Sequence, residues 1–216
     1  MEFKGLSYLL FDIEGTTSDI KFVKEVMFPY SERELPGFLE RNQNNSEVQA
    51  LMKSTSLEEL LGFIRDDVKH PALKKIQGMI WQNAFENGDF KAPLYEDVLP
   101  AWNQWKEEGY KLGIYSSGSV TAQKMFFGHT TEGDLLNHLE NHFDLEIGGK
   151  KEAESYKTIA DMLGLPPQEI LFLSDVPEEL AAAQNSEFQV AHVVRPGTET
   201  SSFPTIRSFA ELELSR

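Results

Sequence analysis

The feature that most constrains this chain is the apolar run 8–11, which ends in two carboxylates, Asp12 and Glu14. The run has the length and bulky apolar content of a β-strand buried on both faces. Gly15 follows and lets the chain turn away sharply. An arbitrary Asp-x-Glu is usually a strand-ending Asp beside a solvated Glu, whereas two acids in a crevice are costly to desolvate unless a cation lies between them. Features farther along the chain favour the crevice.

Length and composition indicate one large domain, or a core with an insert. The chain has 216 residues, 40% of them hydrophobic, which is enough for a substantial core. Cysteine is absent, which excludes disulfides and thiolate metal sites and favours a reducing compartment. The N-terminal apolar run is too short for a signal peptide, and no stretch has the length of a membrane span. We therefore expect a soluble, cytoplasmic protein, and we expect it to be a monomer.

The charge balance narrows the choice of partners. The chain has 35 acidic and 20 basic residues, a net charge of −15. This charge argues against nucleic acid and against an anionic membrane as partners. If the substrate is a small-molecule phosphate, the site itself has to supply local positive charge.

Residues 20–95 interrupt the alternation of strands and helices and predict a helical insert. Apolar residues recur there at helical spacing, and prolines punctuate the helices. The stretch is too long for a single crossover between two strands. The remaining segments, 1–19 and 96–216, then form the core domain.

The second half of the chain predicts an α/β fold with a doubly wound parallel sheet. We expect strands at 112–115, 143–147, 170–173 and 190–194. We expect helices at 98–108, 120–127, 155–163 and 178–184, the third of them ending at Gly164. Strands joined by helices of this length form parallel sheets.

Polar side chains follow the first four expected strands, 8–11, 112–115, 143–147 and 170–173, at their carboxyl ends, where the ligand crevice of a parallel sheet lies. They are Asp12 and Glu14, then Ser116 and Ser117, then Lys150 or Lys151, then Asp175 with Glu179 one helical turn beyond.

This set fits phosphoryl transfer. Three carboxylates would hold one Mg²⁺ through oxygen ligands and leave a charge of −1, which a lysine neutralises. The serine turn at a helix N-terminus adds amide donors for phosphate oxygens. Glu179 could orient Asp175 or Lys150, or it could be a solvated acid in the first turn of a helix.

The four motifs resemble those of the haloacid dehalogenase-like phosphohydrolases. They are Asp-x-Glu-Gly-Thr at 12–16, Tyr-Ser-Ser-Gly-Ser at 115–119, the lysine, and Leu-Ser-Asp-Val at 173–176. Longer strings resemble one family within this superfamily, the enolase-phosphatases (acireductone synthases) of methionine salvage. These strings are 11–17, 22–24, 27–30, 77–81, 115–124, 126–129, 154–156 and 193–197.

The resemblance implies a Rossmann-like core with a helical cap inserted after the first strand. It also implies a reaction, in which 2,3-diketo-5-methylthiopentyl 1-phosphate is enolised and then dephosphorylated. The product is the acireductone 1,2-dihydroxy-3-keto-5-methylthiopentene.

The resemblance also implies roles for the residues at the strand ends. Asp12 is then the nucleophile and a metal ligand, and Asp175 is a further metal ligand. Glu14, which stands where the superfamily usually has Asp, is then the third metal ligand and a possible acid or base, and its precise role stays open. Ser116, Ser117 and Lys150 bind phosphate, with Lys150 chosen over Lys151 by its spacing to Tyr156.

Several alternatives stay open at the level of the sequence. Trp81 and Phe85 could pack the methylthio end of the substrate or belong to a buried core. The pair His138 and His142 has the spacing of zinc helices, but its Glu is misplaced for His-Glu-x-x-His, so we expect no zinc. The chain could also be a generic capped phosphatase for a sugar or glycolate phosphate, or a non-catalytic module that binds a phosphorylated ligand.

Overall fold

The computed structural model describes residues 1–66 and 68–216. The chain divides into two compact units. The first unit is formed by Met1–Asp19 and Ala92–Arg216, and the second by Ile20–Lys91. Within the described residues, no helix is long and apolar enough to cross a lipid bilayer.

The core of the first unit is a six-stranded parallel sheet with strand order β4-β3-β2-β5-β6-β7. Its central strand β2 pairs with β3 on one side and with β5 on the other. The strands are β2 (Tyr8–Phe11), β3 (Lys111–Tyr115), β4 (Asn141–Phe143), β5 (Ile170–Ser174), β6 (Gln189–Val193) and β7 (Thr205–Ile206). This arrangement confirms the predicted doubly wound α/β fold.

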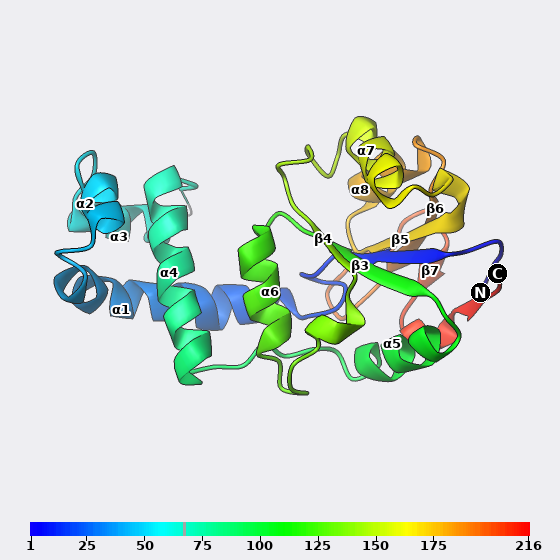
Figure 1. Ribbon diagram of the computed structural model, residues 1–216, viewed down its shortest axis with the longest axis horizontal. Helices are drawn as coiled ribbons and strands as arrows, with labels where there is room; N and C mark the ends of the chain where they lie inside the picture. The colour runs from blue at the N-terminus through cyan, green and yellow to red at the C-terminus, as the bar shows by residue number, and fades with distance from the viewer. Residues whose placement is uncertain (67) are drawn as a thin grey trace. The chain divides into compact units, whose positions relative to one another are not determined.

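Helices cover both faces of this sheet (Figure 1). Tyr8 and Leu10 of β2 belong to a cluster with buried side chains of α7 (Ala153–Leu163) and α8 (Pro177–Gln184). Phe11 faces the other side and lies 5.5 Å from Trp102 and 6.0 Å from Trp105, measured between ring centroids. Both tryptophans belong to α5 (Val98–Glu107). Since side chains alternate along a strand, β2 is buried on both faces, as its apolar run predicted.

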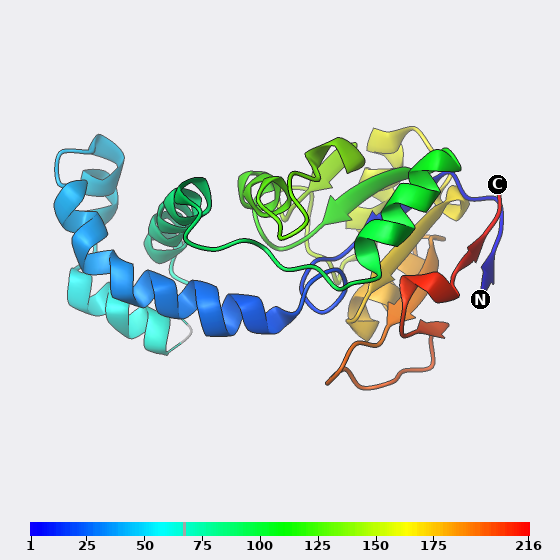
Figure 2. The same ribbon diagram turned by 90° about the horizontal axis from the view of Figure 1, so that it is seen from below.

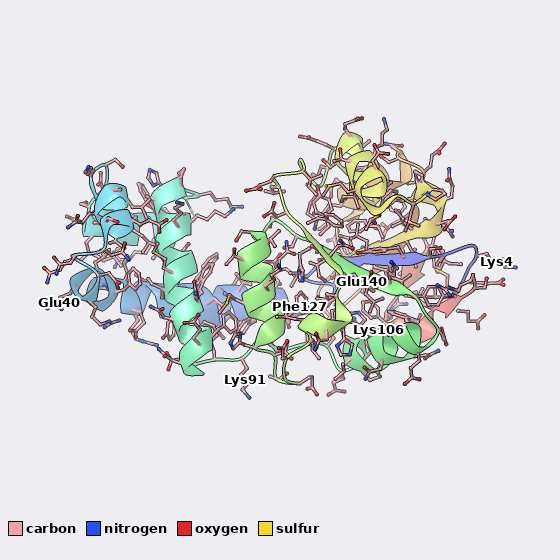
Figure 3. The ribbon with its side chains drawn as sticks, in the orientation of Figure 1. Lys4, Glu40, Lys91, Lys106, Phe127 and Glu140 are labelled. Atoms are coloured by element: carbon pink, nitrogen blue, oxygen red, sulfur yellow. The ribbon has the colours of Figure 1, made fainter. Side chains whose placement is uncertain are left out.

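Local signals explain where the helices of this unit begin and end. The Ser119 side chain accepts a hydrogen bond from the amide of Ala122 and caps α6 (Val120–Gly128). Helix α7 ends at Gly164, which adopts a φ of 65° in the left-handed region. Phe127 of α6, labelled in Figure 3, packs against Trp102 at 5.6 Å and joins α6 to the same side of the core. Three short 3₁₀ helices complete the unit: η2 (Leu136–His138), η3 (Pro167–Glu169) and η4 (Phe209–Glu211).

The prediction of a strand at 143–147 is wrong in its position. Strand β4 ends at Phe143, and the chain turns immediately after it. The Asp144 side chain accepts hydrogen bonds from the amides of Glu146 and Val120, both at 2.9 Å. A side chain that satisfies nearby amides favours a turn over a ladder. The apolar pattern of Phe143 through Ile147 therefore does not mark a strand.

A second, two-stranded sheet joins the two ends of the chain and was not predicted. Strands β1 (Glu2–Phe3) and β8 (Glu213–Leu214) pair in parallel. The amides of Glu213 and Ser215 donate to the carbonyls of Met1 and Phe3, at 2.8 and 2.9 Å. Figure 2 shows the two ends of the chain side by side.

The second unit is helical and has its own apolar core. It contains the π-helix η1 (Phe22–Met27), α1 (Phe28–Arg41), α2 (Ser46–Met52), α3 (Leu57–Arg65) and α4 (Pro71–Asn87). Ser56 and Glu59 form a capping box at the start of α3. The buried residues of its core come from each of the α-helices just named: Leu35, Phe38, Val48, Leu60, Leu73, Ile76 and Ile80. Charged side chains of this unit labelled in Figure 3, Glu40 and Lys91, are exposed.

The aromatic cluster around Phe11 generates a stability prediction. Replacing Phe11 with Ala should lower the free energy of unfolding by about 3–5 kcal/mol, because it leaves a cavity among the rings of Trp102, Trp105 and Phe209. Urea denaturation measures this change. Met162→Ala, at a side chain that is 64% exposed, is the control and should stay within about 0.5 kcal/mol of the parent.

Candidate active site

The loop after β2 is a tight, internally bonded turn. The amide of Asp12 still donates to the carbonyl of Leu173 at 3.0 Å, as the last bond toward β5. The amides of Thr16, Thr17 and Ser18 then all donate to the carbonyl of Ile13, at 3.2, 2.9 and 3.0 Å. This turn fixes Asp12 at the carboxyl end of the central strand.

Asp12, Lys150 and Glu179 form a buried ionic cluster. Lys150 Nζ donates to Asp12 Oδ1 and lies 2.7 Å from Glu179 Oε2. The Lys150 side chain is only 7% exposed, and Ser174 Oγ donates to the same Glu179 oxygen at 2.9 Å. Burial acts to lower the pKa of Lys150, but the charges of Asp12 and Glu179 outweigh it and hold this pKa above its usual range. The lysine therefore stays charged.

Lys151, the other lysine of this loop, faces solvent. Its side chain is 63% exposed and lies 3.8 Å from the carboxylate of Glu178. Of the two lysines that the sequence offered, the structure brings Lys150 to Asp12.

Two tyrosine hydroxyls position the loop that carries Lys150. Tyr156 donates to the carbonyl of Lys150 itself at 2.7 Å, and Tyr115 donates to that of Gly148 at 2.9 Å. The two rings meet edge to face at 5.5 Å, and both residues are fully buried. The sequence offered no signal for this role beyond the spacing of Tyr156 from the lysine.

Asp175 lies against the turn after β2. A Cβ atom added to Gly15 would stand 2.1 Å from Asp175 Oδ2, so only glycine permits this approach. Asp175 Oδ1 is buried and has no hydrogen-bond partner among the described residues. Burial, and then the charge of Asp12, raise the pKa of Asp175 to about 7.

Glu14 is the fourth acid of this region. Burial, and then the charge of Asp12, raise its pKa to about 7 as well. Within residues 1–66 and 68–216, however, no three His, Cys, Asp or Glu side chains are grouped so that they could hold a metal ion. The expected set of three carboxylate ligands is therefore not preformed.

The serine turn after β3 is asymmetric. Ser116 is buried, and its amide donates to the carbonyl of Phe143 at 3.2 Å, while Ser117 is exposed. The turn is held by Gln123, whose amide group donates to the carbonyls of Gly118 and Phe143 at 2.9 and 2.7 Å. Sequence reasoning gave Gln123 no role, although it lies within the string 115–124.

The remaining candidates lie elsewhere. His138 is in η2 and His142 in β4, so the pair does not share one helix. Trp81 and Phe85 lie on α4 of the second unit. Trp81 donates to the carbonyl of Met27 at 2.9 Å, and the buried Phe85 ring lies 4.7 Å from that of Phe90.

Taken together, the strand ends place one buried lysine among four acids. A carboxylate held by a lysine through one oxygen can attack an electrophile with the other. Two acids with raised pKa values can exchange protons near neutral pH or receive a cation in place of the proton. This combination suits transfer of a phosphoryl group.

Comparisons with known proteins agree with the geometry. Residues 7–187 match the model of the haloacid dehalogenase-like hydrolases. The Enolase-phosphatase E1 of Aquifex aeolicus is 47% identical to this chain, over 95% of the chain and 98% of the relative. That of Klebsiella oxytoca is 42% identical over 93% and 94%.

Solved structures show the same architecture. The UTR4 protein of Saccharomyces cerevisiae superposes with a TM-score of 0.83 at 33% identity, over 94% of this chain and 98% of that one. CbbY of Rhodobacter sphaeroides, solved in complex with phosphate, reaches 0.64 at 16% identity, over 95% and 96%. This second likeness concerns the fold alone.

The buried lysine generates a prediction about stability and pH. Lys150→Met should lower the free energy of unfolding by about 3–5 kcal/mol near neutral pH, because it leaves Asp12 and Glu179 buried without a counter-charge. The loss should be smaller in acid, because burial raises the pKa of Glu179 and a protonated Glu179 needs no counter-charge.

Denaturant titrations of Lys150→Met and of the parent, carried out near neutral pH and in acid, measure the change in the free energy of unfolding. Lys151→Met is the matched control and should change the free energy of unfolding by less than about 1 kcal/mol. Equal losses for the two variants would contradict the assignment of Lys150.

Proposed function

This chain belongs to the haloacid dehalogenase-like hydrolases and, within them, to the enolase-phosphatases, and on this premise we propose its substrate and the roles of its residues. The substrate is 2,3-diketo-5-methylthiopentyl 1-phosphate. The products are the acireductone 1,2-dihydroxy-3-keto-5-methylthiopentene and phosphate, a step of methionine salvage. The observation that carries the proposal is the buried contact of Asp12 with Lys150 at the end of the central strand.

One Mg²⁺ ion per chain fits the acids of this site. Asp12 and Asp175 supply carboxylate oxygens, and Asp175 Oδ1 is buried with no partner among the described residues. Mg²⁺ is commonly held by one or two carboxylates together with water and substrate phosphate, so it needs no preformed set of three side chains. Bound there, the ion neutralises negative charge on the phosphate and on the acids.

Glu14 contributes to this site in one of two ways. Its carboxylate can serve as a further oxygen ligand of the ion. With a pKa of about 7, its carboxyl group can instead act as an acid or base. We assign the Glu14 side chain the role of acid or base.

Asp12 is the nucleophile. Lys150 holds Oδ1, so Oδ2 attacks phosphorus, an Asp12–phosphorus bond forms, and the bond from phosphorus to the substrate oxygen breaks. The leaving oxygen takes up the proton of the Glu14 carboxyl group. Water then loses a proton to the Glu14 carboxylate and attacks the phosphorus, the Asp12–phosphorus bond breaks, and phosphate is released.

Phosphate binding falls to Lys150 and the serine turn. The Ser116 amide is already used within the protein, so its hydroxyl group and the exposed Ser117 are the donors that remain.

Asp12, Lys150, Asp175 and Glu179 all come from one chain, which supports a monomer as the working unit, and we place the enzyme in the cytoplasm.

Enolisation and hydrolysis should be separable. Removal of a C1 proton needs a base but no nucleophile, so Asp12→Asn should exchange a deuterium label at C1 with solvent while releasing no phosphate. Mass spectrometry follows the label, and a phosphate assay follows hydrolysis. Asp161→Asn, at an exposed acid of α7, should leave both steps unchanged.

A generic phosphatase would behave differently. The wild-type enzyme should hydrolyse an analogue with CH₂ in place of the C2 carbonyl far more slowly than the diketone, because the analogue cannot enolise. Equal rates would refute the enolase step and leave an ordinary phosphatase. No phosphate release from either compound would favour a binding module instead.

Mg²⁺ should raise the melting temperature more at about pH 8 than at about pH 6. With a pKa of about 7, Asp175 holds a proton at the lower pH, and the ion has to displace it. Without metal, the raised pKa values of Glu14 and Asp175, both about 7, make stability fall as the pH rises from about 4 to about 7, because the folded state binds these protons more tightly than the unfolded state does. Calorimetry with Asp175→Asn as control checks both statements. A metal-induced shift that does not depend on pH would contradict the first statement, and a metal-free melting temperature that does not fall between about pH 4 and about pH 7 would contradict the second.

A further inference from the structure

We infer that Arg195 is a positioning residue for the reaction, because it holds the main chain of the loop that carries Asp12 and Glu14. Arg195 is buried and lies two residues beyond β6, in a part of the chain far from that loop in sequence. The inference rests on the proposed function, since it assigns Arg195 to the geometry of the same site.

The hydrogen bonds of Arg195 are directed at protein groups. Its Nε and Nη2 both donate to the carbonyl of Thr16, at 3.1 and 3.0 Å. Its Nη1 donates to Asp97 Oδ2 at 2.9 Å and to the carbonyl of Arg207 at 3.2 Å. A guanidinium group has five N–H donors, and four of them are engaged here. Arg195 therefore has too few free donors to clasp a phosphate group through paired bonds, although it follows the carboxyl end of a strand.

The guanidinium group is itself held firmly. Its Cζ lies 4.2 Å from the ring centroid of Tyr95 and 5.0 Å from that of Phe209. Asp97 Oδ2, which accepts from Arg195, also accepts from the amide of Phe209 at 2.7 Å. The ion pair between Arg195 and Asp97 balances the charge of both groups locally. Arg195 therefore acts on the site through position and not through its net charge.

Thr16 connects this anchor to the reacting groups. Its amide donates to the carbonyl of Ile13, and its neighbour Gly15 makes the close approach to Asp175. The next carbonyl, that of Thr17, accepts from the amide of Tyr95 at 3.0 Å. Two consecutive carbonyls are thus held from outside the loop. Loss of the Arg195 bonds would free the first of them and let the spacing between Asp12 and Asp175 vary.

The test compares Arg195→Gln and Arg195→Lys with the wild type on the diketone phosphate. We expect kcat to fall about 10- to 100-fold, because small displacements of reacting groups have effects of this size. KM should stay within about threefold, because the bonds of Arg195 go to protein groups. Lysine should not restore the rate, since it cannot donate two parallel bonds to one carbonyl.

Arg216→Gln is the matched control. Arg216 also donates to a backbone carbonyl, that of Gly109 at 2.7 Å, and lies over the ring of Tyr110 at 5.6 Å. Gly109 and Tyr110 precede β3, so Arg216 lies near the amino ends of the strands, whereas the site lies at their carboxyl ends. The control variant should keep the wild-type kcat.

Two further readouts separate positioning from a loss of folding. Guanidinium ion at low concentration should raise the kcat of Arg195→Ala, whereas methylammonium should not. Amide hydrogen exchange in residues 12–18 should be faster in Arg195→Gln than in Arg216→Gln, in the absence of any substrate.

The outcomes distinguish this inference from the proposed function. A wild-type kcat in Arg195→Gln, or a large rise in KM with kcat unchanged, would overturn the positioning role. If the wild-type enzyme itself fails to turn over the diketone phosphate, the proposed function fails. Hydrogen exchange then still decides whether Arg195 holds the loop, because it needs no turnover.

Discussion

The site depends on one buried cation placed among acids. Lys150 contacts Asp12 and Glu179 at once and offsets one of their two negative charges, and without it the end of the central strand would carry only negative charge. Much of the surrounding structure maintains this contact. Tyr115 and Tyr156 hold the carbonyls of the lysine loop, and Gly148 has a φ of 143° and no room for a Cβ beside Ser155. These contacts hold the loop in place within the protein itself, without help from a ligand.

The order of the strands explains why these groups meet. The chain leaves β2 toward β3 and β4 on one side, then returns to β5, β6 and β7 on the other. The connections that follow β2 and β5 therefore run in opposite directions, and such a reversal is where ligands bind in parallel sheets. Asp12 follows β2 and Asp175 follows β5, so this single change of direction in the winding brings the two acids to the same place at the carboxyl end of the sheet.

The sequence predicted the parts of the structure that depend on local patterns. The strand at Tyr8–Phe11, the end of α7 at Gly164 and the convergence of Asp12, Lys150 and Asp175 all follow from periodicity, glycine and strand ends. The β4 boundary was misplaced because a side chain, that of Asp144, outweighed the apolar pattern. Arg195 could not be found this way, since its partner Thr16 lies 179 positions away and contributes only a backbone carbonyl.

The pairing of β1 with β8 gives the chain a defined mechanical response. The two strands run parallel, with the N-terminus at the start of one and the C-terminus after the end of the other. A force that pulls the two ends apart therefore loads their hydrogen bonds in shear. The bonds from Glu213 to Met1, from Ser215 to Phe3 and from Leu6 to Ser215 share that load and have to break together. In a pulling experiment, the hydrogen bonds of this small sheet have to break before force reaches the larger sheet and the site that it carries.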